Sequence, residues 1–204
     1  MKIGIINTNS GNFFSLFKIL EDFNCDYLIC SKPNEIKNVD KVIIPGVGSF
    51  DKVMNFLNKQ LLTEEIKEQV LFKKKFLLGI CLGMQILFEK SSEGISTTGL
   101  SVLKGQVISL KEKNCKSTIP HIGWNSIEIK NNSLIMKNIR SGTDFYFAHS
   151  FVVDDVEKNI ISAKTFYDVD FISCISSLNI FGVQFHPEKS SSSGRTLIKN
   201  FLDL

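Results

Sequence analysis

The sequence predicts an α/β fold with a single doubly wound, mostly parallel central sheet that is flanked by helices and carries antiparallel additions in its second half. Two observations predict it. Through the first half, short apolar runs alternate with stretches of helical periodicity. In the second half, strand-like runs follow one another with little helix between them. With 204 residues, 43% of them hydrophobic, the chain has a globular composition, and we expect residues 1–204 to form one domain.

Apolar spacing defines the elements of the first half. We expect strands at Lys2–Ile6, Asp26–Cys30, Lys41–Ile44 and Phe76–Ile80. Apolar residues that recur every three or four positions predict helices at Asn12–Asp22, Phe50–Leu57, Thr63–Phe72 and Leu82–Phe88. This order matches repeated strand–helix–strand units, which build parallel sheets.

The second half is predicted to be mostly strand. The strand-like runs are Val102–Leu110, Ile127–Ile129, Asp144–Val153, Ile160–Phe166, Phe171–Ser176 and Ile180–Phe185. A final helix is expected at Arg195–Leu202, whose apolar residues share one face. We interpret the serine run at 190–193 as a loop and helix N-cap and not as a domain boundary.

Composition and spacing exclude several classes of function. A net charge of +3 is too weak to indicate a nucleic-acid partner, and the apolar runs are too short to span a membrane. The N-terminus lacks a signal-peptide pattern, so we expect a cytoplasmic protein. The five cysteines include no CxxC pair and the three histidines lack ligand spacing, so we expect reduced thiols, no metal and no cofactor.

Cys81 is a candidate nucleophile. It follows the predicted strand Phe76–Ile80, and Gly79 and Gly83 flank it two residues away on each side. The same small-residue spacing lets hydrolases form the sharp turn that presents a nucleophile at the carboxyl end of a sheet. The backbone N–H of Leu82 would then point toward a developing oxyanion. The alternative is a buried cysteine that acts as a small hydrophobic residue.

His186 is the candidate base. It follows a predicted buried strand and precedes Pro187, and Glu188 lies two residues further on. A carboxylate that accepts a hydrogen bond from one ring nitrogen leaves the other nitrogen to move a proton to and from a thiol. A structural histidine at the end of a strand, with Glu188 a solvated charge, is the alternative interpretation.

The loop Pro45-Gly46-Val47-Gly48 follows the predicted strand Lys41–Ile44. Its two glycines permit backbone conformations that turn an N–H toward an anion. An oxyanion loop, a phosphate-binding loop and a plain turn all fit this pattern. The phosphate interpretation lacks the Lys-Ser/Thr of the full Walker motif.

Four segments together resemble the class I (triad-type) glutamine amidotransferases and, within them, the HisH glutaminase subunits of imidazole glycerol phosphate synthase. They are Gly79–Glu89 (GICLGMQILFE), Pro120–Asn125 (PHIGWN), Phe145–Phe151 (FYFAHSF) and His186–Ser190 (HPEKS). With the Pro45–Gly48 loop, the resemblance runs from the first predicted strand to the last helix in the family's order. It implies the family's fold and its glutaminase activity.

The resemblance also implies roles for individual residues. Cys81 would attack the side-chain amide of glutamine while His186, oriented by Glu188, moves protons. Backbone N–H groups of Leu82 and of Gly46, Val47 and Gly48 would hold the oxyanion. The glutamine would contact Gln85, Glu89, Ser150 and Phe151. Gln85 and Glu89 are expected one and two helical turns beyond Cys81 on one face.

The family delivers ammonia to HisF, a TIM-barrel cyclase subunit, which makes imidazole glycerol phosphate and AICAR on the way to histidine. The resemblance places Asn12, Trp124 and Lys189 at the interface of this heterodimer. One segment departs from the family: Asn7-Thr8-Asn9-Ser10 stands where an Asp-Tyr-Gly-like segment is usual. The departure leaves the triad intact and bears on the identity of the partner.

Other functions remain open at this point. A HisH-like subunit could supply ammonia to a sugar-aminating synthase, and the glutaminase of pyridoxal phosphate synthesis shares the triad but lacks the pattern Gly123-Trp124-Asn125. A non-catalytic regulatory subunit on the same fold would be indicated by loss of Cys81 or His186, and both are present. A flavodoxin-like cofactor-binding module would need a phosphate loop that the sequence lacks.

Overall fold

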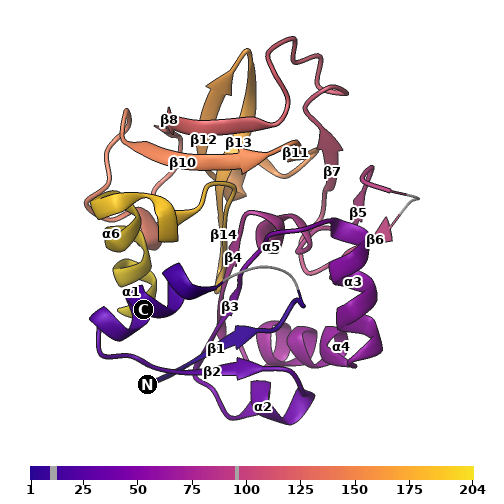
Figure 1. The fold of residues 1–204 in the computed structure, drawn as a ribbon, viewed down its shortest axis with the longest axis vertical. Helices are drawn as coiled ribbons and strands as arrows, with labels where there is room; N and C mark the ends of the chain where they lie inside the picture. The colour runs from indigo at the N-terminus through magenta and orange to yellow at the C-terminus, as the bar shows by residue number, and fades with distance from the viewer. Residues whose placement is uncertain (10–12, 95–96) are drawn as a thin grey trace.

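The computed structural model describes residues 1–9, 13–94 and 97–204, and its centre is an eight-stranded sheet in the order β2-β1-β3-β4-β14-β13-β12-β9 (Figure 1). The strands β2, β1, β3, β4 and β14 are mutually parallel, and β13, β12 and β9 continue the sheet antiparallel. Their bounds are β1 Lys2–Ile6, β2 Asp26–Cys30, β3 Lys41–Ile44, β4 Phe76–Ile80, β9 Glu128–Ile129, β12 Ile161–Tyr167, β13 Val169–Ser177 and β14 Ile180–Val183. The predicted α/β class and the mostly parallel first half are confirmed.

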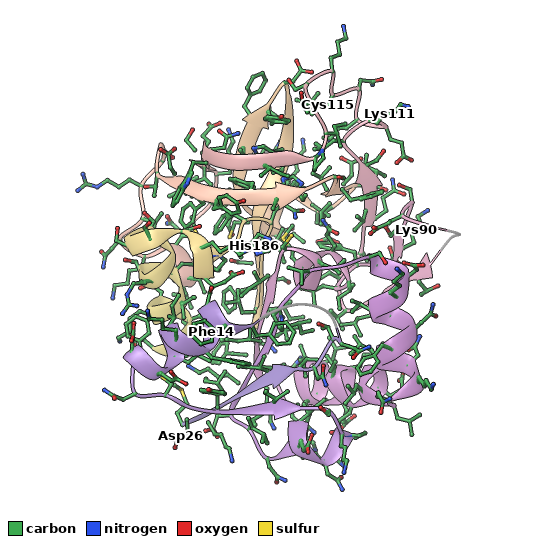
Figure 2. All side chains as sticks on the ribbon, viewed as in Figure 1. Phe14, Asp26, Lys90, Lys111, Cys115 and His186 are labelled. Atoms are coloured by element: carbon green, nitrogen blue, oxygen red, sulfur yellow. The ribbon has the colours of Figure 1, made fainter. Side chains whose placement is uncertain are left out.

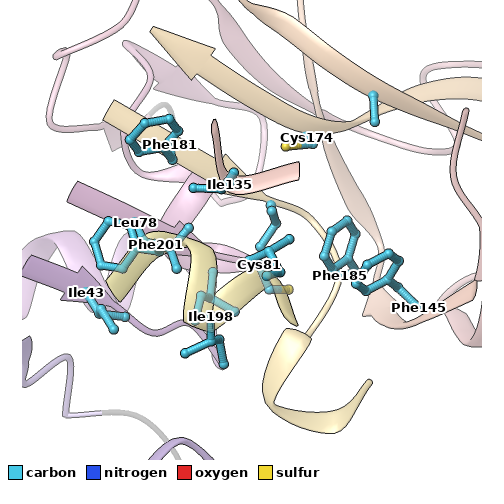
Figure 3. Close-up of a cluster of buried hydrophobic side chains, with 14 of the residues drawn as sticks. Ile43, Leu78, Cys81, Ile135, Phe145, Cys174, Phe181, Phe185, Ile198 and Phe201 are labelled. Atoms are coloured by element: carbon cyan, nitrogen blue, oxygen red, sulfur yellow. The ribbon is translucent and has the colours of Figure 1, made fainter. Parts of the chain in front are cut away.

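Helices cover both faces of this sheet because its strands are apolar on both sides. Ile43 of β3 packs in one core with the buried residues of α1 (Phe14–Asp22) and α6 (Ser191–Leu202). Its neighbours Val42 and Ile44 point to the opposite core, which contains the buried residues of α3 (Phe50–Lys59) and α4 (Leu62–Lys67). Figure 3 shows part of the first core, with Cys81 among its side chains.

Two smaller sheets stand beside the central one. One pairs β8 (His121–Ser126) with β10 (Asp144–His149), and the other has the order β11-β7-β5-β6. The bounds of the latter are β5 Lys90–Ser91, β6 Thr97–Thr98, β7 Gln106–Ser109 and β11 Phe151–Asp154. The run 144–153, predicted as one strand, therefore breaks at Ser150, where the chain passes from one sheet to the other.

Several boundaries differ from the prediction. Helix α2 (Pro33–Lys37) and strand β8 were not predicted, the run 63–72 divides into α4 and a π-helix at Glu68–Phe72, and Asn12 lies outside the described residues. Helix α5 spans Leu82–Gln85 and does not reach residue 88. Beyond Gln85 the hydrogen bonds reach only three residues back, since Leu87 N–H donates to Met84 O at 3.1 Å and Phe88 N–H donates to Gln85 O at 3.2 Å, and segment 99–103 then bonds the carbonyls of residues 86–88. Those carbonyls are then unavailable to a continuing helix.

Ser190 precedes α6 but its side chain does not cap the helix. Its hydroxyl donates to His186 O at 2.6 Å and accepts from Tyr146 N–H at 3.0 Å. The serine therefore fixes the loop after β14 against β10. As predicted for the serine run, Ser190 is the N-cap residue of α6, although its side chain makes no capping hydrogen bond.

A buried lysine ties β3 to the end of the last helix. Lys41 is only 6% exposed, and its Nζ donates to Phe201 O at 3.1 Å and to Leu202 O at 2.6 Å. Burial lowers the pKa of this amine. The ammonium thus satisfies carbonyls that the C-terminus of α6 leaves without helical donors and complements the helix dipole.

We predict that Lys41→Met lowers the free energy of unfolding by about 1–2 kcal/mol, because two buried carbonyls lose their charged donor while the apolar contacts remain. Urea unfolding of the two proteins measures the difference. Lys52→Met, at an exposed position of α3, is the matched control and should change stability little. Equal stability of the Lys41 and Lys52 variants would contradict the assigned role.

Candidate active site

Cys81 occupies a strained turn between β4 and α5. Its backbone has φ 51° and ψ −109°, and its N–H donates to Val183 O of β14 at 2.7 Å. A positive φ is uncommon for a residue with a side chain and persists where the surroundings hold it. A Cβ at Gly83 would lie 1.9 Å from Ile44 O, and one at Gly79 would lie 2.5 Å from Gly83 O. The two glycines are therefore required by backbone packing around the turn.

His186 and Glu188 lie beside this turn, after β14. The His186 Nδ1 is 2.7 Å from Glu188 Oε1, and His186 lines the same cavity as Cys81. Burial disfavours the imidazolium, but Cys81 and Glu188 outweigh burial and raise the pKa of His186 to about 10. Figure 2 shows His186 in the interior, just below β10. The geometry suits a thiolate–imidazolium pair oriented by a carboxylate.

A second polar side chain contacts the sulfur. Gln184 is fully buried, and its Nε2 donates to Cys81 Sγ at 3.5 Å. Its amide is oriented by Gln85, whose Nε2 donates to Gln184 Oε1 at 3.0 Å and to Phe151 O at 2.9 Å. Gln184 was not predicted as a site residue, although it stands two residues before His186 in the same motif.

The loop Pro45–Gly48 packs directly against the turn at Cys81. A Cβ at Gly46 would lie 2.2 Å from Gly83 N, and Gly48 has φ 111°. Gly46, Val47, Gly48 and Leu82 line one cavity together with Cys81. Two chain segments that carry backbone N–H groups thus line the cavity together with Cys81.

This cavity has a volume of about 290 Å³, a size that suits a small-molecule ligand. It brings together most of the residues that the sequence analysis selected. Besides the loop, Cys81, Leu82 and His186, its lining includes Gln85, Ser150, Phe151 and Lys189. Ser150 and Phe151 reach it because the chain changes sheets at this point.

The placement predicted for Glu89 is wrong. Helix α5 ends at Gln85, so Glu89 does not share a helix face with it; Glu89 is exposed, and its carboxylate accepts from Gly105 N–H at 3.1 Å. Glu93 lines the cavity instead, and its Oε2 accepts from Phe50 N–H at 3.0 Å. Burial raises the pKa of Glu93. Sequence spacing could not identify Glu93, because the chain folds back after residue 88.

Of the three residues predicted at an interface, Trp124 and Lys189 are exposed and Asn12 is not described. Trp124 is 54% exposed on β8, next to Ile122 at 62%. Lys189 is exposed, and its Nζ lies 5.8 Å from the centroid of the Tyr146 ring, which in turn contacts Trp124 edge-on at 6.2 Å. Asn12 lies outside the described residues, as does Ser10 of the departing segment. Trp124, Tyr146 and Lys189 thus form one aromatic–cationic cluster at the mouth of the cavity.

Two further histidines lie at the cavity: His149 lines it, and His121 lies behind His149. His121 and His149 are 3% and 6% exposed, and His121 Nδ1 is 3.1 Å from His149 Nε2. Burial lowers the pKa of His121 to about 4. Burial and the neighbouring His121 lower the pKa of His149 to about 3. Both rings are therefore neutral near pH 7.

A larger cavity, of about 630 Å³, lies away from Cys81, along α6 and the segment 134–138. Two of its cationic side chains are already paired: Arg195 with Asp22, and Lys199 with Asp203. Its lining contains no cysteine or histidine. We therefore place the chemistry at the smaller cavity.

Within the described ranges, no cluster of three or more His, Cys, Asp or Glu side chains is arranged to hold a metal ion. None of the helices in those ranges has both the length and the apolar composition needed to cross a membrane. All five cysteines are unpaired thiols.

Comparison with known proteins agrees with the geometry. Residues 5–204 match the family model "Glutamine amidotransferase class-I". The chain is 45% identical over 199 residues to the imidazole glycerol phosphate synthase subunit HisH of Caldanaerobacter subterraneus, covering 98% of this chain and 96% of the relative. It is 41% identical over 202 residues to the HisH subunit of Bacillus subtilis, covering 98% and 94% of the two chains.

Solved structures share the fold at much lower sequence identity. A putative GMP synthase component from Thermoplasma acidophilum superposes with a TM-score of 0.76 at 17% identity, covering all of this chain and 92% of the other. A structure described as glutamine amidotransferase gives a TM-score of 0.77 at 17% identity, covering 98% and 97%. These two likenesses concern the fold alone.

We predict that acid destabilises the protein through the two buried histidines. Because their folded pKa values lie below the ordinary 6.5, the unfolded state binds more protons between about pH 6.5 and 4, so stability is complete above this window and falls as pH decreases. His186 has a raised pKa, is protonated in both states below pH 6, and adds no slope there. At pH 5 the loss should be on the order of 2–4 kcal/mol.

Urea unfolding at pH 5.0, 6.0 and 7.0 measures this slope. His121→Asn removes one of the two titrating groups and should make the slope between pH 5 and 7 visibly shallower. An unchanged slope in that variant would show that other groups carry the acid sensitivity.

Proposed function

We propose that this chain, which belongs to the class I glutamine amidotransferase family and to the HisH subunits within it, hydrolyses glutamine to glutamate and ammonia as the glutaminase subunit of imidazole glycerol phosphate synthase in histidine biosynthesis. The observation that carries the proposal is that Cys81 and His186 line one small-molecule cavity while Glu188 hydrogen-bonds His186 Nδ1 from outside the lining. The nucleophile comes from the turn after β4 and the base from the loop after the neighbouring strand β14.

The reaction follows from the charges at the site. The Cys81 thiolate attacks the side-chain carboxamide carbon, and the protonated His186 gives its proton to the departing nitrogen, which leaves as ammonia. A glutamyl thioester remains on Cys81. His186 then takes a proton from water as the water attacks the thioester, and glutamate leaves. Glu188 keeps the imidazole in the required orientation and stabilises its charged form.

Oxygen charge develops twice in this sequence, once in each tetrahedral intermediate. We assign its stabilisation to the backbone N–H of Leu82 and to N–H groups of Gly46, Val47 and Gly48. Gln184 supports the sulfur itself through its amide hydrogen bond.

The amino-acid end of glutamine is assigned to the opposite wall of the cavity. Its ammonium group requires an anion, and Glu93 is the one carboxylate among the described lining residues. Gln85 and the backbone at Ser150 and Phe151 complete the polar surface. Glu93 thereby replaces Glu89 in the set of proposed glutamine contacts.

We predict that Glu93→Gln raises KM for glutamine by about tenfold or more, because a charge-assisted contact to the substrate ammonium is lost. Steady-state glutamate release measures it. Glu89→Gln changes the same functional group four residues away and outside the cavity, so it is the matched control. Equal effects of the two substitutions would refute the assignment of Glu93.

The ammonia must reach an acceptor before water protonates it, which requires a partner docked at the cavity. We propose a HisF-type TIM-barrel cyclase subunit that contacts Asn12, Trp124 and Lys189. Support comes from the exposed cluster of Trp124, Tyr146 and Lys189 beside the cavity mouth, since exposed aromatic and cationic side chains are common interface anchors. We also propose that residues 1–204 work as one glutamine amidotransferase domain in the cytoplasm, without a cofactor.

The departure at residues 7–10 supports a second acceptor. Asn7 and Asn9 make local contacts there, Asn7 Nδ2 donating to Ser31 Oγ at 3.0 Å and Asn9 N–H donating to Asn7 Oδ1 at 2.9 Å. A sugar-aminating synthase would use the same glutaminase chemistry with a different docked subunit. The acceptor, and not the triad, separates the two candidates.

The deciding experiment measures glutamate release from glutamine by the purified chain, first alone and then with the cyclase subunit of the same genome and its phosphoribosyl-formimino nucleotide. We expect large stimulation by partner and nucleotide, because the two sites are coupled, and complete loss of turnover in Cys81→Ala with the complex still formed. Retained turnover in Cys81→Ala would exclude Cys81 as the nucleophile. Absence of stimulation by a folded, ammonia-competent cyclase would favour the sugar-aminating alternative.

A further inference from the structure

We propose that His121 and His149 form a positioning relay that fixes the carbonyl of Phe151 and, through it, the glutamine-binding wall of the cavity. The expected effect on KM rests on the proposed glutaminase function. The tautomers of the two rings follow from hydrogen-bond direction alone. Neither histidine takes part in the chemistry at Cys81 in this scheme.

The contact between His149 and Phe151 determines which nitrogen of each ring carries the proton. His149 Nδ1 lies 3.0 Å from Phe151 O, and a carbonyl only accepts hydrogen bonds, so this nitrogen carries the proton. In a neutral ring, His149 Nε2 is then an acceptor. Its partner 3.1 Å away, His121 Nδ1, must therefore be the donor.

The contact between Asn125 and His121 independently indicates the same tautomer for His121. Ser126 N–H donates to Asn125 Oδ1 at 2.8 Å, which fixes the orientation of that amide. Its Nδ2 donates to Phe166 O at 3.0 Å and faces His121 Nε2 at 3.4 Å. His121 Nε2 is thus the acceptor, so its proton is on Nδ1. The two ends agree on one tautomer for each ring.

The surroundings hold the rings in place. His121 stacks between Tyr167, at a centroid distance of 4.0 Å, and Phe147, at 4.9 Å. Phe171 packs edge-on against both histidines. In a closely packed aromatic cage, a ring cannot rotate without displacing its neighbours. The cage also keeps both rings neutral, which the directional argument requires.

The relay ends at the carbonyl of Phe151, which accepts a second hydrogen bond. Phe151 O accepts from His149 and also from Gln85, the residue that orients Gln184 against the Cys81 sulfur. It lies where the chain passes from β10 to β11, so no single sheet holds it on both sides. If His149 moved its proton to Nε2, a lone pair would face this carbonyl and the contact would become repulsive. His121 prevents this change by donating to Nε2.

The test compares two substitutions at His121, which does not line the cavity. In His121→Asn, the amide nitrogen occupies roughly the place of Nδ1 and keeps the donor, whereas His121→Leu removes it. In the complex with the cyclase subunit, we expect His121→Leu to raise KM for glutamine by about tenfold while kcat changes less than about threefold. His121→Asn should restore KM to near the wild-type value. Equal KM values for the two variants would overturn the relay.

Nitrogen NMR of the imidazoles reads the tautomers without turnover. Wild type should show the proton on Nδ1 of both His121 and His149, and His121→Leu should shift the His149 Nε2 resonance, because this nitrogen loses its hydrogen-bond donor. A wild-type spectrum with either proton on Nε2 overturns the proposal, and this measurement stands even if His121→Leu fails to fold. Correct tautomers without any glutamine hydrolysis would overturn the glutaminase function alone, and wrong tautomers with normal hydrolysis would overturn the relay alone.

Discussion

Close contact between backbone segments at Gly46, Gly79 and Gly83 is the constraint on which the site depends. At each of these positions a Cβ would lie 2.5 Å or less from a backbone atom of a neighbouring segment. This packing supports the positive φ of Cys81 and brings the loop after β3 against the turn that contains Cys81. The same backbone packing therefore positions both the thiol and the N–H groups proposed for the oxyanion. The packing of β3, β4 and β14 offsets the conformational strain at Cys81.

The sequence was sufficient for the parts of the site that are determined locally. The spacing of Gly79, Cys81 and Gly83 predicts a nucleophile turn, and His186 with Glu188 predicts an oriented base, because each needs only a few neighbouring residues. Glu93 and Gln184 could not be found in this way. Glu93 lines the cavity because α5 ends at Gln85 and the chain then pairs with segment 99–103, which local periodicity does not reveal.

The same distinction applies to the fold. The first half was predicted well because each parallel strand is a short apolar run with its own crossover helix. The second half contains strands that change sheets, and a continuous apolar pattern from 144 to 153 gives no sign of the break at Ser150. The break matters for the site because it brings Ser150 and Phe151 into the lining of the cavity.

The β8–β10 pair has a different role on each face. Along β8, His121, Gly123 and Asn125 face inward, whereas Ile122 and Trp124 are exposed on the outer face. The polar contacts behind the cavity and the aromatic cluster at its mouth are thus built on alternate residues of one short strand. A slip of one residue in the pairing with β10 would exchange the two sets. The pairing register of β8 with β10 therefore positions the residues behind the cavity and those of the candidate docking face together. A substitution that shifts the register would alter both surfaces.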